Sequence, residues 1–267
     1  MPARQLDQEG DGVLERIKRA AAALSGRLKG TASGTAATSG EADLVSLMEE
    51  LLPLQEQSLG HDHPDTNETR DRLADAYHRA GRGDDEVPLL KQLLAYRQRL
   101  LGHDHHDTNA VHNRLGGTYM SLSRWDEAIP HFEQLLAYRE KMFGPQVYSV
   151  VGARRVLGVA CYRACRYAEA VALFERNLTY VDRSGADTYE DRCNLAAAYE
   201  AAGRWDQAIP LYEELLTYRE QFVGHNDPFA QRARDDLDRV YRSAGRPDEA
   251  AALSEAGPHR PSSSTQE

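Results

Sequence analysis

The chain has 267 residues, of which 41% are hydrophobic and 28% charged, and its formal net charge is −10. This acidic balance argues against nucleic acid as the main partner, because nucleic-acid-binding proteins present a basic face. Three cysteines make no disulfide framework, no signal-peptide pattern opens the chain and no apolar run approaches the roughly 20 residues of a membrane span, so we expect a cytoplasmic protein with no integral membrane association.

Residues 1–40 are expected to form an N-terminal extension. Residues 12–29 can form a basic helix with an apolar side, and residues 30–40, GTASGTAATSG, have the composition of a flexible linker. The helix can be interpreted as a tethered element that binds a partner or a membrane surface. It can also be a loosely ordered extension or a helix folded back on the rest of the chain. The abundance of alanine and the modest amphipathic pattern favour the second interpretation.

Internal repeats follow this extension. The strings LADAYHRAG, LGGTYMSLS, LGVACYRAC, LAAAYEAAG and LDRVYRSAG align on Tyr77, Tyr119, Cys161, Tyr199 and Tyr241, with spacings of 42, 42, 38 and 42 residues. A second apolar string, such as IPHFEQLLAYREKMFG, follows each of the first four, and an isolated copy stands at residues 44–60. Apolar residues recur at helical spacing within these strings. Each repeat is therefore predicted to be a pair of helices, preceded by half a repeat.

Glycine and aspartate mark the expected helix ends. Glycine recurs where the first helix of a pair should end, at Gly81, Gly203 and Gly245. Asp65 with Glu68 resembles a capping box at the start of a helix, and Asp227 followed by Pro228 predicts an N-cap with proline in the first turn.

The repeat resembles the tetratricopeptide repeat. Leu115, Gly116, Tyr119, Ala128 and Phe132 match that family's pattern, and the 42-residue length is similar to the longer repeats of kinesin light chains and many bacterial proteins. The resemblance covers about residues 41–256. It implies an all-α fold, a right-handed α-α superhelix of about five helix pairs plus an N-terminal half-repeat, with residues 257–267 as a disordered tail.

Two departures from the pattern carry their own expectations. Glu86 stands where later repeats have a small alanine, and we expect it to lie in a loosely packed or solvent-exposed place near the end of the array. Cys161, Cys165 and Cys193 are interpreted as small buried hydrophobic residues, since free cysteine is often buried.

Two histidine-rich loops, residues 61–63 and 103–107, contain side chains suited to zinc or similar ions. They recur where the repeat family has its linking loop, so we favour linker residues whose last aspartate caps the next helix. A metal-dependent enzyme or metal-binding protein stays as the alternative function. No nucleotide-binding glycine loop, G-x-S-x-G or H-E-x-x-H motif is present, and we predict no catalytic or cofactor-binding residue and no enzyme.

The family resemblance implies that first helices line a concave groove that binds partners. It assigns groove positions to Cys193 and Ala197, among others. The side chains expected to contact a partner are His78, Arg79, Asn113, Met120, Arg155, Val159, Tyr162, Arg163 and Glu200. Arg155 and Arg163 are suited to pairing with carboxylates. We therefore expect an adaptor or regulatory subunit that captures an extended or helical protein segment. Self-assembly into homo-oligomers through the array ends stays open.

Overall fold

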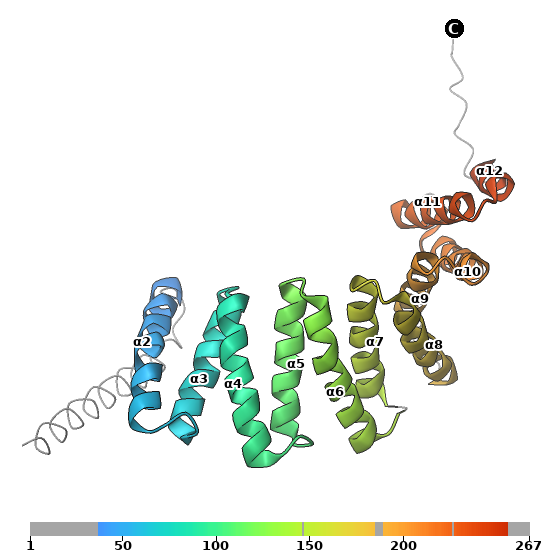
Figure 1. The fold of residues 1–267 in the computed structure, drawn as a ribbon. Coiled ribbons are helices and arrows are strands. Elements are labelled where there is room, and N and C mark those ends of the chain that lie inside the picture. Colours follow the sequence, from blue (N-terminus) through green and yellow to red (C-terminus); the bar gives the residue numbers. More distant parts are fainter. Residues whose placement is uncertain (1–36, 146, 185–188, 226, 256–267) are drawn as a thin grey trace, which may run out of the picture. The chain divides into compact units, whose positions relative to one another are not determined.

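The computed structural model describes residues 37–145, 147–184, 189–225 and 227–255, and all regular structure in these ranges is helical (Figure 1). The all-α prediction is therefore confirmed for the described chain. The helices are α2 (Ala37–Ser58), α3 (Pro64–Arg79), α4 (Gly83–Leu101), α5 (His106–Ser121), α6 (Trp125–Phe143), α7 (Tyr148–Arg163), α8 (Tyr167–Ser184), α9 (Tyr189–Ala201), α10 (Trp205–Val223), α11 (Pro228–Ser243) and α12 (Pro247–Glu255). None of these described helices is both long and apolar enough to cross a lipid bilayer.

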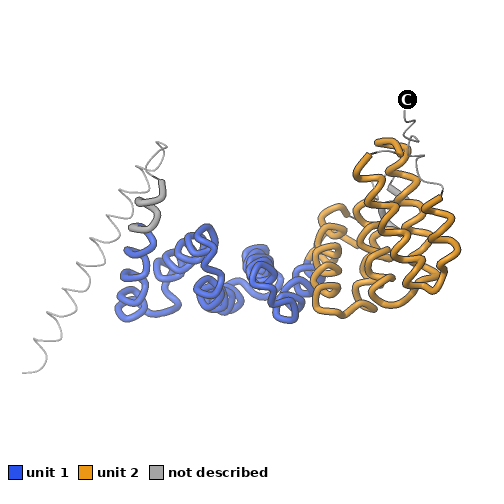
Figure 2. The backbone as a smooth tube through the Cα atoms, turned by 90° about the horizontal axis from the view of Figure 1, so that it is seen from above, with its two compact units in different colours: residues 1–138 blue, residues 139–267 orange. Residues whose placement is uncertain are grey.

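Two compact units divide the chain within α6 (Figure 2). Unit 1 ends at Tyr138 and contains α2 to α5 and most of α6, and unit 2 begins at Arg139 and contains the end of α6 with α7 to α12. Inside each unit, helices that follow one another in sequence pack against each other, α5 and α6 through side chains such as His112 and His131. The described helices form five pairs preceded by the single helix α2, as the repeat pattern predicts.

Helix α2 starts earlier than the composition suggests. It begins at Ala37, so the end of the predicted linker 30–40 is helical. Thr38, Ser39 and Gly40 have low helix propensity, so the helix reaches them because they are continuous with the packed apolar face of α2 and not because of their composition. That face supplies Met48 and Leu51, which pack in one buried cluster with Leu73 and Tyr77 of α3. The predicted helix at 12–29 and the tail at 257–267 lie outside the described residues.

Glycine allows close helix crossings in the second and third repeats. A Cβ atom added at Gly116 would lie 2.7 Å from the Phe132 ring, and one added at Gly158 would lie 2.6 Å from the Phe174 ring. Both phenylalanine rings are buried. The absence of a side chain at these two positions therefore lets an aromatic ring from the second helix lie against the backbone of the first.

Histidine caps two of the first helices. The Nδ1 atom of His63 accepts a hydrogen bond from the Asp65 amide at 3.2 Å, and Nδ1 of His105 accepts one from the Asp107 amide at 3.1 Å. The predicted capping by Asp65 and Asp107 is therefore wrong, because each helix begins two residues earlier and leaves these aspartates in its first turn. The predicted cap at Asp227 is confirmed, since its Oδ1 accepts from the Phe229 amide at 2.8 Å.

Helix α7 lacks a side-chain cap, so adding one there directly tests whether such caps stabilise the chain. Val147 precedes α7 in an extended conformation and has no acceptor for the free amides of the first turn. We expect Val147→Asp to raise the free energy of unfolding by about 1 kcal/mol, the usual contribution of an N-cap side chain. Urea denaturation of the full chain checks this. His105→Ala should shift the midpoint in the opposite direction, and equal midpoints for both variants would contradict the capping role.

The ends of the first helices follow the predicted pattern. Gly81, Gly203 and Gly245 have positive φ angles of 69°, 70° and 74°. Ser123 and Cys165 take the same left-handed conformation at the equivalent positions, with φ of 58° and 60°. Cys165 is exposed there, so the prediction that it is buried is wrong, whereas Cys161 is buried as expected.

A buried arginine links consecutive repeats at three places. Arg70 pairs with Glu56 at 2.6 Å, Arg154 pairs with Glu140 at 2.6 Å, and Arg234 pairs with Glu220. Each pair joins the first helix of a repeat to the second helix that precedes it. All three arginine side chains are almost fully buried, so each carboxylate neutralises a charge that would be costly to bury alone.

Candidate partner-binding site

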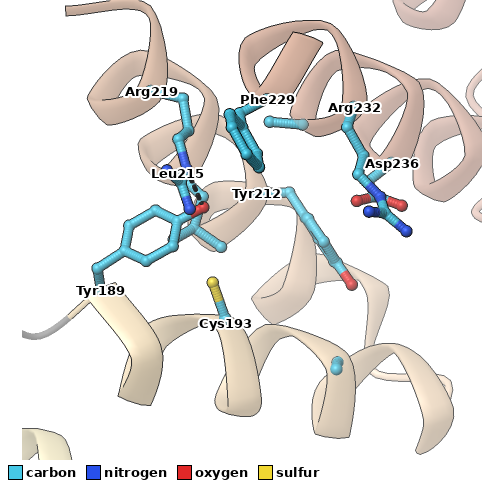
Figure 3. A pocket seen from close by; sticks show the side chains of 10 residues that line it. Tyr189, Cys193, Tyr212, Leu215, Arg219, Phe229, Arg232 and Asp236 are labelled. Atoms are coloured by element: carbon cyan, nitrogen blue, oxygen red, sulfur yellow. Dashed lines mark hydrogen bonds between the residues drawn. The ribbon is translucent and has the colours of Figure 1, made fainter. Parts of the chain in front are cut away.

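A pocket of about 440 Å³ lies in unit 2 between α9, α10 and α11 (Figure 3). Its walls combine apolar and charged side chains. They are Tyr189, Cys193 and Ala197 from α9, Tyr212, Leu215 and Arg219 from α10, and Phe229, Arg232, Ala233 and Asp236 from α11.

Arg219 is held among aromatic rings on one side of the pocket. Its Nε donates a hydrogen bond to the Tyr189 hydroxyl at 2.6 Å, and its guanidinium lies 4.2 Å from the Tyr189 ring centroid and 5.5 Å from that of Phe229 (Figure 3). Tyr218 continues this cluster, with its ring 5.0 Å from that of Tyr189. Because these contacts fix the guanidinium without a carboxylate partner, its positive charge is available to a ligand.

The position of the Tyr212 ring depends on the size of the residue that faces it on α9. It occupies the repeat position of Phe132 and Phe174, whereas Ala196 stands where those repeats have glycine. A ring cannot lie against a Cβ atom as closely as Phe174 lies against Gly158. Tyr212 is half-buried and lines the pocket, and its hydroxyl donates to Glu200 at 2.6 Å. Burial, followed by the nearby Asp236 carboxylate, raises the pKa of Tyr212, so the phenol stays neutral.

Charged groups at the α11 side of the pocket differ in how they are paired. Asp236 pairs with Arg239 at 3.1 Å, and burial raises the pKa of Asp236 although the charge of Arg232 acts in the opposite direction. Arg232 is exposed and forms no hydrogen bond or ion pair with a described residue. Burial also raises the pKa of the Cys193 thiol, which keeps this side chain neutral at the apolar base. The pocket therefore offers an apolar interior beside two arginines, Arg219 and Arg232, that form no ion pair with a described carboxylate.

Arg155, predicted to meet a partner, is occupied inside unit 2. Its Nε and terminal nitrogen donate to the two oxygens of Asp191 at 2.8 and 2.7 Å, and its other terminal nitrogen donates to Glu190 at 3.0 Å. Asp191 is fully buried. The expectation that Arg155 binds a carboxylate of the partner is therefore corrected, because its guanidinium already neutralises the buried Asp191 carboxylate of the same chain.

The other predicted groove residues lie on first helices, as the repeat register implies, and none of them lines the pocket. In unit 2, Val159 and Tyr162 are half-buried, Arg163 is exposed and Glu200 pairs with Arg239. In unit 1, Asn113, His78 and Arg79 are exposed and Met120 is half-buried. Their contact with a partner stays a prediction. Cys193 and Ala197, also assigned to groove positions, do line the pocket.

Glu86 is buried, although its replacement of a small alanine predicted a loosely packed or exposed position. Its side chain is 1% exposed, and its Oε2 lies 3.2 Å from Nδ1 of His78. The expectation of a loosely packed or exposed position is therefore wrong. The carboxylate can be buried because His78 supplies a hydrogen-bonding partner and Arg114 lies 3.9 Å from its second oxygen.

Residues of the histidine-rich loops form hydrogen bonds with groups at the starts of α3 and α5. Besides the two caps, the carbonyl oxygens of His61 and His103 accept hydrogen bonds from the side chains of Asn67 and Asn109, at 2.8 and 2.9 Å. Within the described residues, no three histidine, cysteine or acidic side chains come close enough together to hold a metal ion. The structure thus gives these loops a role in joining repeats and offers no observation that favours the metal alternative.

Sequence reasoning missed the part of the pocket that α10 and α11 supply. The family resemblance implies groove positions on first helices alone, whereas Leu215 and Arg219 reach the pocket from a second helix. Arg219 has counterparts in Arg97 and Arg139, so nothing in the repeat pattern distinguishes it. The useful signal was the replacement of glycine by Ala196 opposite an aromatic residue.

Known proteins share this repeat. The family model described as tetratricopeptide repeat matches residues 72–141, 107–180 and 186–256. Crystal structures with similar folds include a point variant of the nearly identical TPR-like repeats of a kinesin light chain-like protein from Podosopora anserina, at 25% identity and TM-score 0.58 over 72% of this chain and 93% of that one. They also include BtubC from P. vanneervenii, at 18% identity and TM-score 0.51 over 81% of this chain and 94% of that one, and the MamA protein, at 18% identity and TM-score 0.52 over 72% and 90% of the two chains. No curated protein matches. The family model covers well over half of the sequence, and the chain therefore belongs to the tetratricopeptide repeat family.

Proposed function

We propose that the chain is a cytoplasmic protein-binding scaffold and that unit 2 holds a segment of the partner in the pocket between α9, α10 and α11. Membership of the tetratricopeptide repeat family supports protein–protein interaction in general. The observation that carries the finer proposal is the apolar pocket next to Arg219 and Arg232, which form no ion pair with a carboxylate among the described residues.

The size and lining of the pocket fit a protein side chain. Its volume of about 440 Å³ lies within the range of roughly 300–1,000 Å³ usual for ligand pockets. Leu215, Phe229 and the neutral Cys193 give it an interior that favours an apolar group over a charged one. Phe229 is 60% exposed, so binding an apolar side chain would also remove this ring from water.

The two arginines favour a partner segment that carries a negative charge. Most arginines of the described chain pair with a carboxylate, but Arg219 contacts a phenol and two rings, and Arg232 has no such partner. A guanidinium binds a carboxylate through two parallel hydrogen bonds. We therefore propose a segment in which an acidic residue lies close to a bulky apolar residue. This revises the expectation that Arg155 and Arg163 receive the acidic groups, because Arg155 is occupied by Asp191.

Filling the pocket tests this proposal. A phage-displayed library of random peptides is selected on the full chain, and the selected peptides are titrated against variants. Peptides that carry an apolar residue near Asp or Glu should bind Ala233→Trp at least about tenfold more weakly, a loss of about 1.4 kcal/mol. Arg232→Glu should weaken the same peptides, since it reverses the charge that meets their carboxylate.

Matched substitutions outside the pocket serve as controls. Ala252→Trp places the same side chain on the exposed face of α12, and Arg72→Glu reverses an exposed arginine of unit 1. Both should leave the affinity within about twofold of the original value, because surface charges away from a site contribute little. Selected peptides that bind Ala233→Trp as tightly as the unmodified chain would place the interface elsewhere.

A further inference from the structure

The second repeat contains a histidine pair where the other repeats have different residues. His112 occupies the position of the buried arginines Arg70, Arg154 and Arg234. His131 occupies the position of Leu89, Leu173, Leu211 and Leu253. The glutamate that pairs with those buried arginines is also replaced, by Gln98. This repeat has therefore exchanged a permanent ion pair for two groups whose charge depends on pH.

The two rings contact each other directly. Nδ1 of His112 lies 2.9 Å from Nδ1 of His131, and the ring centroids are 5.2 Å apart. Tyr119 stacks on His131 at 5.7 Å with an interplanar angle of 11°, and His112 is 8% exposed. The bond joins α5 to α6, and it requires one ring to donate a proton from Nδ1 while the other offers a lone pair there. Two protonated rings cannot make it.

The surroundings oppose protonation of the pair. Lys91 of α4 and His103 of the α4–α5 loop act on it as positive or potentially positive groups. Arg124 lies over the Tyr119 ring on the α6 side, and the nearby carboxylate Glu127 is already paired with it at 2.9 Å. Burial lowers the pKa of His131 to about 4, with the charges of His112 and Lys91 contributing, and burial also lowers the pKa of His112.

We propose that the His112–His131 pair is an acid-sensitive contact that holds α5 against α6 when both rings are neutral and releases them on mild acidification. The unfolded chain takes up protons on histidine near pH 6.5, whereas the folded pair resists them until a lower pH. The folded state therefore binds fewer protons in this window. The stabilisation is fully present above about pH 6.5 and falls as the pH drops towards about 4. Since Asn113 and Met120 lie on α5, release also alters the surface that this helix presents.

Amide hydrogen exchange at two pH values tests the switch. After correction for intrinsic rates, protection of α5 and α6 should fall about tenfold more between pH 7.5 and pH 5.0 than protection of α9 and α10. The control is the triple variant Gln98→Glu, His112→Arg, His131→Leu, which restores the residues of the other repeats. Its α5 and α6 should lose no more protection than α9 and α10.

A direct titration keeps the inference testable if the triple variant does not fold. The imidazole protons of His112 and His131 are followed by NMR in the unmodified chain, with single variants used for assignment. Both should titrate at a lower pH than an ordinary imidazole, with His131 near pH 4. Ordinary titration of both rings near pH 6.5, or equal loss of protection in the triple variant and the unmodified chain, would overturn the proposal.

Discussion

Replacing Arg155 by alanine should lower the free energy of unfolding of unit 2 by about 3 kcal/mol, the lower end of the range for breaking a buried ion pair. The substitution leaves the Asp191 carboxylate, which is 0% exposed, without the guanidinium that binds both its oxygens. Among the described residues, Asn177 also contacts Asp191, with its Nδ2 3.5 Å from Asp191 Oδ1, and a single long contact cannot replace two charged hydrogen bonds. Urea denaturation of the full chain, followed by circular dichroism and by hydrogen exchange in α7 to α9, measures the loss.

The control for this prediction is Arg166→Ala, which removes a partly exposed arginine from the same unit. Arg166 pairs with Glu169, and both side chains are substantially exposed, so its loss should change stability by no more than about 0.5 kcal/mol. Arg155→Lys should fall between the two alanine variants, because lysine keeps the charge but cannot bind both oxygens of Asp191. A partner that binds Arg155→Ala more weakly while the stability is unchanged would restore Arg155 as a contact residue and contradict its structural role.

Arg155 also shows where sequence reasoning about this chain reaches its limit. The register of the repeats predicts that Arg155 lies on a first helix, and the structure has it on α7, since this depends on local spacing alone. Whether a side chain at that position is available depends on its neighbour in the next repeat. Asp191 stands 36 residues away, across the junction where the spacing is 38 instead of 42. The sequence shows that the junction is shorter but not which polar groups it brings together.

The N-termini of the helices show the same limit, because a local sequence pattern does not always identify the capping residue. Aspartate followed three residues later by glutamate is a good predictor of a cap, yet α3 begins at Pro64 and His63 takes that role. Proline is favoured in the first turn, and the preceding residue is held extended, so the His-Pro step decides where this helix begins. The Asp227–Pro228 step was interpreted this way and is confirmed. In the candidate site, the positions of Cys193 and Ala197 are predictable from the register, whereas those of Arg219 and Arg232 depend on packing between three helices.

Gly158→Ala should destabilise unit 2 by about 2 kcal/mol, although alanine is the better helix former. The added methyl group would lie 2.6 Å from the buried Phe174 ring, and overpacking of this kind costs about 1–3 kcal/mol or somewhat more. The gain in helix propensity offsets about 1 kcal/mol of that cost. The first repeat shows how the conflict can be resolved, because Ala74 occupies the glycine position there and Leu90 occupies the phenylalanine position, and both are fully buried.

The decisive experiment is therefore a double-mutant cycle with Phe174→Leu. Alone, Phe174→Leu should cost about 1–2 kcal/mol, because the smaller side chain leaves a void against Gly158. Combined with Gly158→Ala it should recreate the Ala–Leu pair of the first repeat, so the double variant should be at least about 1 kcal/mol more stable than the sum of the single effects predicts. Strictly additive effects in urea denaturation would mean that the two positions do not contact each other. A coupling of the expected sign would show that each crossing is specified by the combined size of two residues. That would also explain the pocket, where Ala196 faces a tyrosine and the ring is displaced towards solvent.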